Sequence, residues 1–222
     1  MSTIRIRTAI NQNNAAASMI DTARYNEAIC MLKASLKRFQ KELRSHAAHD
    51  NVHSEPCATA IHHLILQSTT TSLLDRREDS NDDAGFLYDR AVFIPQRVSL
   101  ERHIATHVVS SIQIFNLALA LQLKANATNV DSRLRDSYLR KSMSIYQLVM
   151  MLNGKNSLLS MIVLNNVGLI HRACKHHDRA SECFNRLLAI WIVSPGWANY
   201  LEGMVHNALG WYDTVAFPAA AA

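Results

Sequence analysis

Glycine and proline are scarce in this sequence, with six glycines and four prolines among 222 residues. Tight turns rely on these two residue types, so their scarcity argues against a fold with many tight turns. Hydrophobic residues make up 49% of the chain, and alanine, leucine, serine and asparagine are abundant. The composition predicts an all-α chain, ordered over most of its length, that forms a single domain over residues 1–222.

Cysteine is also sparse, and its four copies show no spacing of a disulfide framework. We therefore expect free thiols in a reducing intracellular compartment, cytoplasmic or nuclear. The residues before Asp21 include Arg5 and Arg7 but no acidic residue. That pattern is shared by organelle transit peptides, so organelle import is the alternative.

The sequence also lacks a long apolar run of the kind that crosses a membrane. The uncharged stretch at residues 107–123 contains serine, glutamine and asparagine and falls short of about 20 mostly apolar residues. It predicts a buried core helix.

No catalytic motif is present, neither G-x-S-x-G, nor H-E-x-x-H, nor paired C-x-x-C. Residues 153–157 (NGKNS) lack the upstream glycine and the strand of a phosphate-binding loop, and instead predict a helix end followed by an Asn or Ser cap. We expect a protein that is not an enzyme and holds no cofactor.

A cluster of zinc-ligand residue types lies between positions 171 and 183. Its spacing places the cysteines at core positions of helices and two of the histidines in the turn between them. The expectation is buried thiols and exposed histidines, with no metal site. The cluster consists of His171, Cys174, His176, His177 and Cys183.

The most informative pattern is a small residue, an alanine twelve positions later and an aromatic residue four positions after that. Gly168, Ala180 and Phe184 form it most clearly. A weaker version begins at Ala16 and includes Ala28, Leu32 and Ser35, and another includes Leu139, Ser142, Tyr146 and Val149. Such spacing is typical of two antiparallel helices packed as one hairpin.

These residues resemble the tetratricopeptide (TPR) repeat family over residues 10–42, 100–152 and 157–192. The family's tryptophan is missing, and about twelve extra residues are expected at the turn of the second hairpin. The resemblance implies a solenoid of about three repeats, closed by a capping helix near 197–212, that acts as a non-catalytic scaffold. It also implies a concave groove that binds a peptide or partner protein. The positions that would line this groove are Asn13, Ala17, Phe115, Leu119, Gln122, Ile162, Asn165, Leu169 and Arg172.

Four asparagines share one register when the hairpins are aligned on their small residues. Asparagine is not favoured inside helices, so its recurrence predicts a repeated polar contact from each first helix to a neighbour. The four are Asn14, Asn116, Asn166 and Asn207.

Between the first and second hairpins the helical period stops over an insertion at residues 45–98. Its apolar stretches 60–67 and 85–95 are short and bounded by polar turn formers, which is typical of strands that could pair as a β-hairpin. The charged stretch 75–83 between them predicts a disordered acidic tip, and 213–222 a loose tail. Whether the insertion covers the groove is left open by the sequence.

The net charge of +5 is spread along the chain except for one cluster. On a helix much of this cluster forms a solvent-facing stripe, which suggests binding to nucleic acid or an anionic membrane as an alternative function. A further alternative, independent of the basic cluster, is a structural role in which the solenoid docks into a larger assembly. The basic cluster consists of Lys33, Lys37, Arg38, Lys41 and Arg44.

Overall fold

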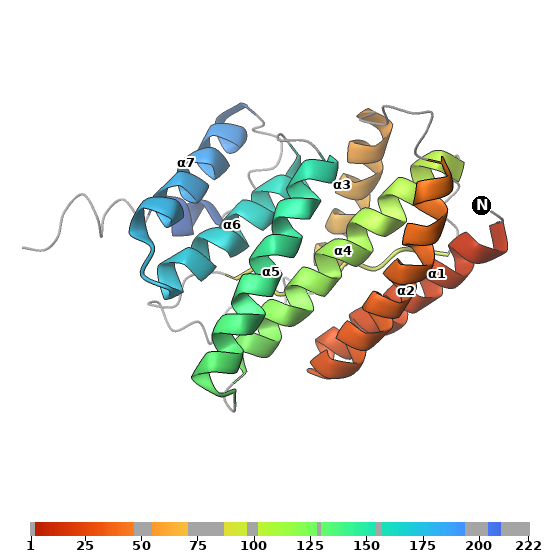
Figure 1. The fold of residues 1–222 in the computed structure, drawn as a ribbon. Helices are drawn as coiled ribbons and strands as arrows, with labels where there is room; N and C mark the ends of the chain where they lie inside the picture. The colour runs from red at the N-terminus through yellow and green to blue at the C-terminus, as the bar shows by residue number, and fades with distance from the viewer. Residues whose placement is uncertain are drawn as a thin grey trace, which may run out of the picture. The chain divides into compact units, whose positions relative to one another are not determined.

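A computed structural model describes residues 3–46, 55–70, 87–96, 102–127, 130–153, 157–193 and 204–209. Helices dominate these residues, and no strand occurs among them, so the predicted all-α class is confirmed (Figure 1). Residues 204–209 are also helical. The seven longer helices are α1 (Thr3–Asp21), α2 (Tyr25–His46), α3 (Glu55–Thr70), α4 (Arg102–Asn126), α5 (Ser132–Asn153), α6 (Leu158–Ala173) and α7 (His177–Val193).

Where the sequence led us to expect one domain, the contacts divide the chain into two compact units. Unit 1 comprises Met1–Thr71 and Asp89–Gly154, and therefore holds α1 to α5. Unit 2 comprises Ser72–Tyr88 and Lys155–Ala222, and holds α6 and α7. The two units are described one at a time.

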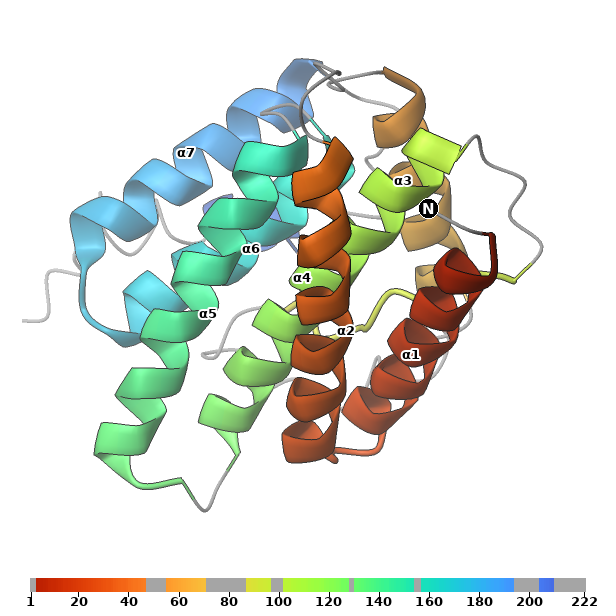
Figure 2. The same ribbon diagram turned by 45° about the vertical axis from the view of Figure 1, so that its right-hand side comes forward.

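Helix α4 is the centre of unit 1, where it packs against α1, α2, α3 and α5 (Figure 2). Every residue from 108 to 122 is buried, which agrees with the core helix predicted there. Residues Ile104–Asn126 are long and apolar enough to span a membrane by length and composition alone. However, 83% of that apolar window is buried inside the protein, as in the core helix of a globular domain.

Two buried glutamines of α4 are hydrogen-bonded to the helices around it. Gln113 Nε2 donates to the Ala9 carbonyl at 2.9 Å and to Ser35 Oγ at 2.8 Å, which ties α4 to both α1 and α2. On the α5 side, Tyr146 OH donates to Gln122 Oε1 at 2.9 Å. Because buried polar groups cost free energy unless they are paired, these contacts fix how α4 is rotated against its neighbours.

The α6–α7 hairpin of unit 2 is packed as its small-residue spacing predicts. Ala180 and Phe184 are fully buried on α7. A Cβ atom placed on Gly168 would lie 2.7 Å from the Phe184 ring, closer than carbon atoms approach without displacement. The glycine therefore makes room for the aromatic ring.

The α1–α2 and α6–α7 turns have the same backbone structure. Ala23 and Lys175 both adopt a left-handed conformation, with φ of 58° and 59°. In each turn this residue and the next donate to carbonyls of the preceding helix: Ala23 to Ile20, Arg24 to Met19, and their counterparts Lys175 to Arg172 and His176 to His171. This is the Schellman arrangement, which satisfies the last carbonyls of a helix.

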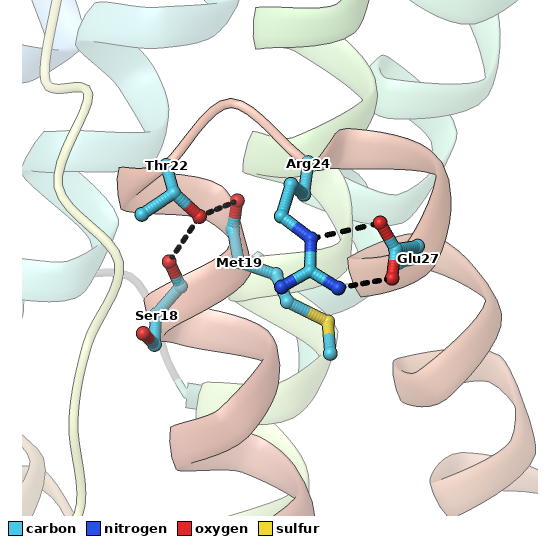
Figure 3. Close-up of polar contacts among 5 residues, drawn as sticks. All are labelled: Ser18, Met19, Thr22, Arg24 and Glu27. Atoms are coloured by element: carbon cyan, nitrogen blue, oxygen red, sulfur yellow. Dashed lines mark hydrogen bonds and ion pairs between the residues drawn. The ribbon is translucent and has the colours of Figure 1, made fainter.

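Side chains complete the first of these turns (Figure 3). Thr22 Oγ1 donates to the Ser18 carbonyl at 2.9 Å, and Arg24 Nε donates to Glu27 Oε1 at 2.8 Å across the start of α2. Elsewhere, Ser157 caps α6 by accepting from the Ser160 amide at 3.1 Å, as the sequence predicted for this region.

The insertion and the second hairpin differ from expectation. Residues 60–67 lie inside α3 rather than in a strand, so the β-hairpin prediction is wrong. The extra length of the second hairpin lies in its helices, because α4 ends at Asn126 and α5 begins at Ser132. The predicted acidic tip, the loose tail and most of the capping helix lie outside the described residues.

We predict that Gly168→Ala lowers the free energy of unfolding by about 1 kcal/mol, because crowding of the Phe184 ring exceeds the gain in helix propensity. In a Phe184→Leu background the same substitution should be neutral or stabilising. Urea denaturation followed by circular dichroism measures both effects. An equal loss in the two backgrounds would show that the ring is not the obstacle.

We also predict that Ala23→Gly and Lys175→Gly each raise the free energy of unfolding by about 0.5–1 kcal/mol, since glycine adopts positive φ without a Cβ clash. The matched control is Ala173→Gly, which places glycine at an exposed helical position and should lower it by about 1 kcal/mol. Thermal unfolding of the three variants tests this. Destabilisation by all three would contradict the role assigned to φ.

Candidate functional site

The segment at residues 87–96 is neither helix nor paired strand, yet much of it is buried. Residues 89–96 belong to unit 1, where the trace passes beside α1 and α4 (Figures 1 and 2). Val92 is 0% exposed and Ile94 is 1% exposed. A buried backbone without secondary structure must find hydrogen-bond partners among side chains.

Asparagines of α1 and α4 hold the peptide groups of Val92. The Val92 amide donates to Asn116 Oδ1 at 2.9 Å, and Asn116 Nδ2 donates back to the Val92 carbonyl at 2.9 Å. Asn13 Nδ2 donates to the same carbonyl at 3.0 Å. The amide group of Asn116 therefore takes the place of a neighbouring strand.

Asn14 holds Ile94 in the same way. The Ile94 amide donates to Asn14 Oδ1 at 2.9 Å, and Asn14 Nδ2 donates to the Ile94 carbonyl at 2.7 Å. Residues two apart in an extended chain turn their peptide groups to the same edge. Residues 92 and 94 thus share an edge, and Asn13, Asn14 and Asn116, which we call the asparagine site, line it.

The opposite edge of the segment meets α3. The Phe93 amide donates to Ser68 Oγ at 3.1 Å, and the next residue on this edge, Pro95, has no amide hydrogen and is exposed. The helices of unit 1 therefore bind amide groups on both edges of the segment.

Unit 2 contains an equivalent pairing. The Tyr88 amide donates to Asn166 Oδ1 at 3.2 Å, and Asn166 Nδ2 donates to the Tyr88 carbonyl at 3.0 Å. In both units one asparagine side chain accepts from the backbone amide of a residue and donates to the carbonyl of the same residue.

Hydrogen bonds between asparagines orient the side chains that make these pairs. In unit 1, Asn116 Nδ2 donates to Asn13 Oδ1 at 3.0 Å and Asn13 Nδ2 donates to Asn14 Oδ1 at 3.3 Å. In unit 2 the corresponding donors are Asn207 to Asn165 at 2.6 Å and Asn165 to Asn166 at 3.1 Å. The same chain of three asparagines therefore occurs twice, as Asn116–Asn13–Asn14 and as Asn207–Asn165–Asn166, and we call it the asparagine relay.

The repeated polar contact predicted for Asn14, Asn116, Asn166 and Asn207 is confirmed. Three of them bind the backbone of residues 88, 92 and 94, and Asn207 binds Asn165. Sequence reasoning did not identify the partner of these three asparagines, which is the backbone of the non-helical segment at residues 87–96. The signal was the apolar stretch 85–95, which was read as one arm of a hairpin.

Most of the predicted groove positions are buried. Asn13, Ala17, Ile162 and Asn165 are 0% exposed. On α4, Phe115 packs with Tyr146 at a ring-centroid distance of 6.0 Å, and Leu119 and Gln122 are buried as well. Leu169 and Arg172, on α6, are half-buried and are the members of the set that solvent reaches.

The basic cluster lies along α2. Lys33, Lys37 and Arg38 are exposed, as expected for a solvent-facing stripe. Lys41 and Arg44 belong to the same helix, but their side chains lie outside the described residues.

The His and Cys cluster is spread over the α6–α7 turn. Burial lowers the pKa of His171, whose ring centroid lies 5.8 Å from that of His176. Burial also raises the pKa of Cys183 to about 11. A thiol with so high a pKa is a poor nucleophile and metal ligand at neutral pH. Within the described part of the chain, no three His, Cys, Asp or Glu side chains come together as metal ligands would.

Comparison of the chain with protein-family models, with curated proteins and with solved structures gives no match.

We predict that Asn116→Asp destabilises the protein in a pH-dependent way. A carboxylate oxygen would face the Val92 carbonyl and Asn13 Oδ1, so the folded-state pKa of the new side chain should rise above the unfolded value of about 3.9. The variant should come closest to wild type below about pH 4 and lose stability as pH rises through the folded-state pKa.

Urea denaturation at pH 4.5 and 7.5, relative to wild type at each pH, measures the effect. The loss at pH 7.5 should be about 3 kcal/mol, because a buried carboxylate would be unpaired. The exposed Asn185→Asp is the matched control and should change stability little at either pH. A pH-independent loss for Asn116→Asp would contradict the hydrogen-bond assignment.

Proposed function

We propose that the chain is a non-catalytic protein–protein interaction module of the TPR type, a scaffold of helical hairpins that binds a partner polypeptide in extended form. The α1–α2 and α6–α7 hairpins support the repeat reading. They share the same Schellman turn and the same asparagine relay, and buried small residues, Ala16 and Gly168, stand at matching positions.

The observation that carries the proposal is the pairing of single asparagines with both peptide groups of one residue. Asn116, Asn14 and Asn166 each do this, with donor–acceptor distances between 2.7 and 3.2 Å. Peptide groups are common to every polypeptide, so such a site recognises an extended backbone and leaves side-chain specificity to the surrounding pockets.

Leu169 and Arg172 are where a partner would first make contact on unit 2. They lie one and two turns beyond Asn166 on α6 and are half-buried, whereas Ile162 and Asn165 on the same helix are fully covered. An apolar and a cationic side chain side by side favour a partner segment that combines an apolar residue with an acidic one.

The proposal predicts site-specific cross-linking. A photo-reactive phenylalanine analogue at position 169 of the full chain should cross-link the partner when the protein is purified from its source cells. The matched control places the same analogue at Arg186, which is exposed on α7, and should yield little of that product. Arg172→Glu should reduce the yield at position 169 at least tenfold by repelling an acidic segment.

Equal yields from positions 169 and 186 would contradict the assignment of the contact face. The assignment would also be contradicted if Arg172→Glu left the cross-linking yield at position 169 unchanged while the variant kept a wild-type circular dichroism spectrum. Substitution of Phe115 or Leu119 is unsuitable here, because both are 0% exposed and their loss would test stability rather than binding.

A further inference from the structure

We infer that residues 89–96 act as a cis ligand of the asparagine site, and that the site can exchange this segment for an extended segment of a partner protein. This inference deepens the proposed function and rests on it. It names the site in unit 1 that would bind the partner, the backbone chemistry it recognises, and the segment that has to leave first.

The contacts of the cis segment are of a kind that another polypeptide can reproduce. On the edge that faces α1 and α4, five hydrogen bonds join asparagine side chains to the amide and carbonyl groups of Val92 and Ile94. None of them involves a side-chain atom of the segment. The site therefore selects for an extended backbone with amide hydrogens two residues apart.

The burial of the segment adds a side-chain requirement. Val92 is 0% and Ile94 1% exposed, whereas Phe93 between them is only half-buried. A partner segment that replaces them needs branched apolar residues at two positions with one residue between them, and no proline at either. Proline fits at the position after them, where Pro95 lies exposed in the cis segment.

An empty site would be strongly disfavoured, so exchange has to replace one occupant by another. Asn13 and Asn116 are 0% exposed, and without an occupant Asn116 Oδ1 loses the Val92 amide. Unpaired buried polar groups are costly. The asparagine relay nonetheless links Asn116, Asn13 and Asn14 by hydrogen bonds that do not involve the segment. These bonds hold the three side chains in position while one occupant replaces another.

The first experiment uses the intact chain and hydrogen–deuterium exchange. The inference expects the Val92 and Ile94 amides to exchange at least tenfold faster than the Phe115 and Leu119 amides of α4, because the segment detaches while α4 stays folded. Exchange of all four at one rate would mean that the segment leaves only on global unfolding, and would overturn the inference.

The second experiment uses a fluorescein-labelled peptide of residues 87–96 (LYDRAVFIPQ) as the probe. Val92→Pro with Ile94→Pro in the full chain removes the two amide donors and should expose the site. This variant should bind the peptide at least tenfold more tightly than wild type by fluorescence anisotropy. Arg90→Pro is the control, because Arg90 is half-exposed and makes none of the bonds to the asparagine site, and it should behave like wild type.

A peptide carrying the same two prolines should not bind the opened variant, and adding Asn116→Ala to that variant should weaken peptide binding at least tenfold. Equal binding of both peptides would overturn the inference. A dimer of the opened variant by light scattering would also overturn it, because the occupant would then be a second copy of the chain.

The two hypotheses fail differently. Cross-linking at position 169 together with uniform slow exchange of the four amides would keep the proposed function and reject exchange at the asparagine site. Local opening and peptide binding without any cross-linked partner would keep the exchange site and reject the proposed contact face.

Discussion

The peptide groups of a buried, non-helical segment are the constraint on which the rest of unit 1 depends. Leaving one such group unpaired costs about 1–3 kcal/mol, and Val92 and Ile94 bring four of them into the interior. An asparagine side chain can pair with both groups of one residue, because its amide presents a donor and an acceptor in the geometry of a peptide group. Its cost inside a helix is only about 0.5 kcal/mol relative to better helix formers, so the hydrogen bonds outweigh it.

Helix α4 connects this site to the remaining helices of unit 1. Asn116 faces the segment, Gln113 bonds to α1 and α2, and Gln122 bonds to α5. These three polar side chains point to different neighbours from one buried helix, so a rotation of α4 would break all of the contacts together. The position of the asparagine site is therefore fixed by the packing of the whole unit.

The sequence predicted the helical class, the hairpins and their packing residues because these depend on short-range spacing. Gly168, Ala180 and Phe184 lie within one hairpin, and their contact follows from helix geometry alone. The asparagine series could also be read from the sequence, since a polar residue that recurs in helix interiors needs a reason. The identity of its partner could not, because Asn14 and Ile94 are brought together only by the tertiary fold.

The error over residues 60–67 has a physical cause of the same kind. AIHHLILQ has branched residues typical of a strand, but Ile61, Leu64 and Ile65 also form the one-sided stripe of a helix, and all three are buried in α3. Of the stretch 85–95, the described residues 87–95 are not helical, but they do not form the predicted strand either. The predicted partner of this stretch was a strand at residues 60–67, which are helical instead. An alternating pattern of apolar residues cannot distinguish pairing with a strand from pairing with side chains.

A segment held in cis has a large advantage over any competitor. Only residues 97–101 separate the segment from α4, and a tether this short gives an effective concentration on the order of millimolar. A free peptide of equal intrinsic affinity at micromolar concentration would therefore displace very little of it. A physiological competitor needs a second contact with the protein, which would raise its own effective concentration to the same range. The asparagine site would then respond to a partner that binds at two points and ignore isolated extended peptides.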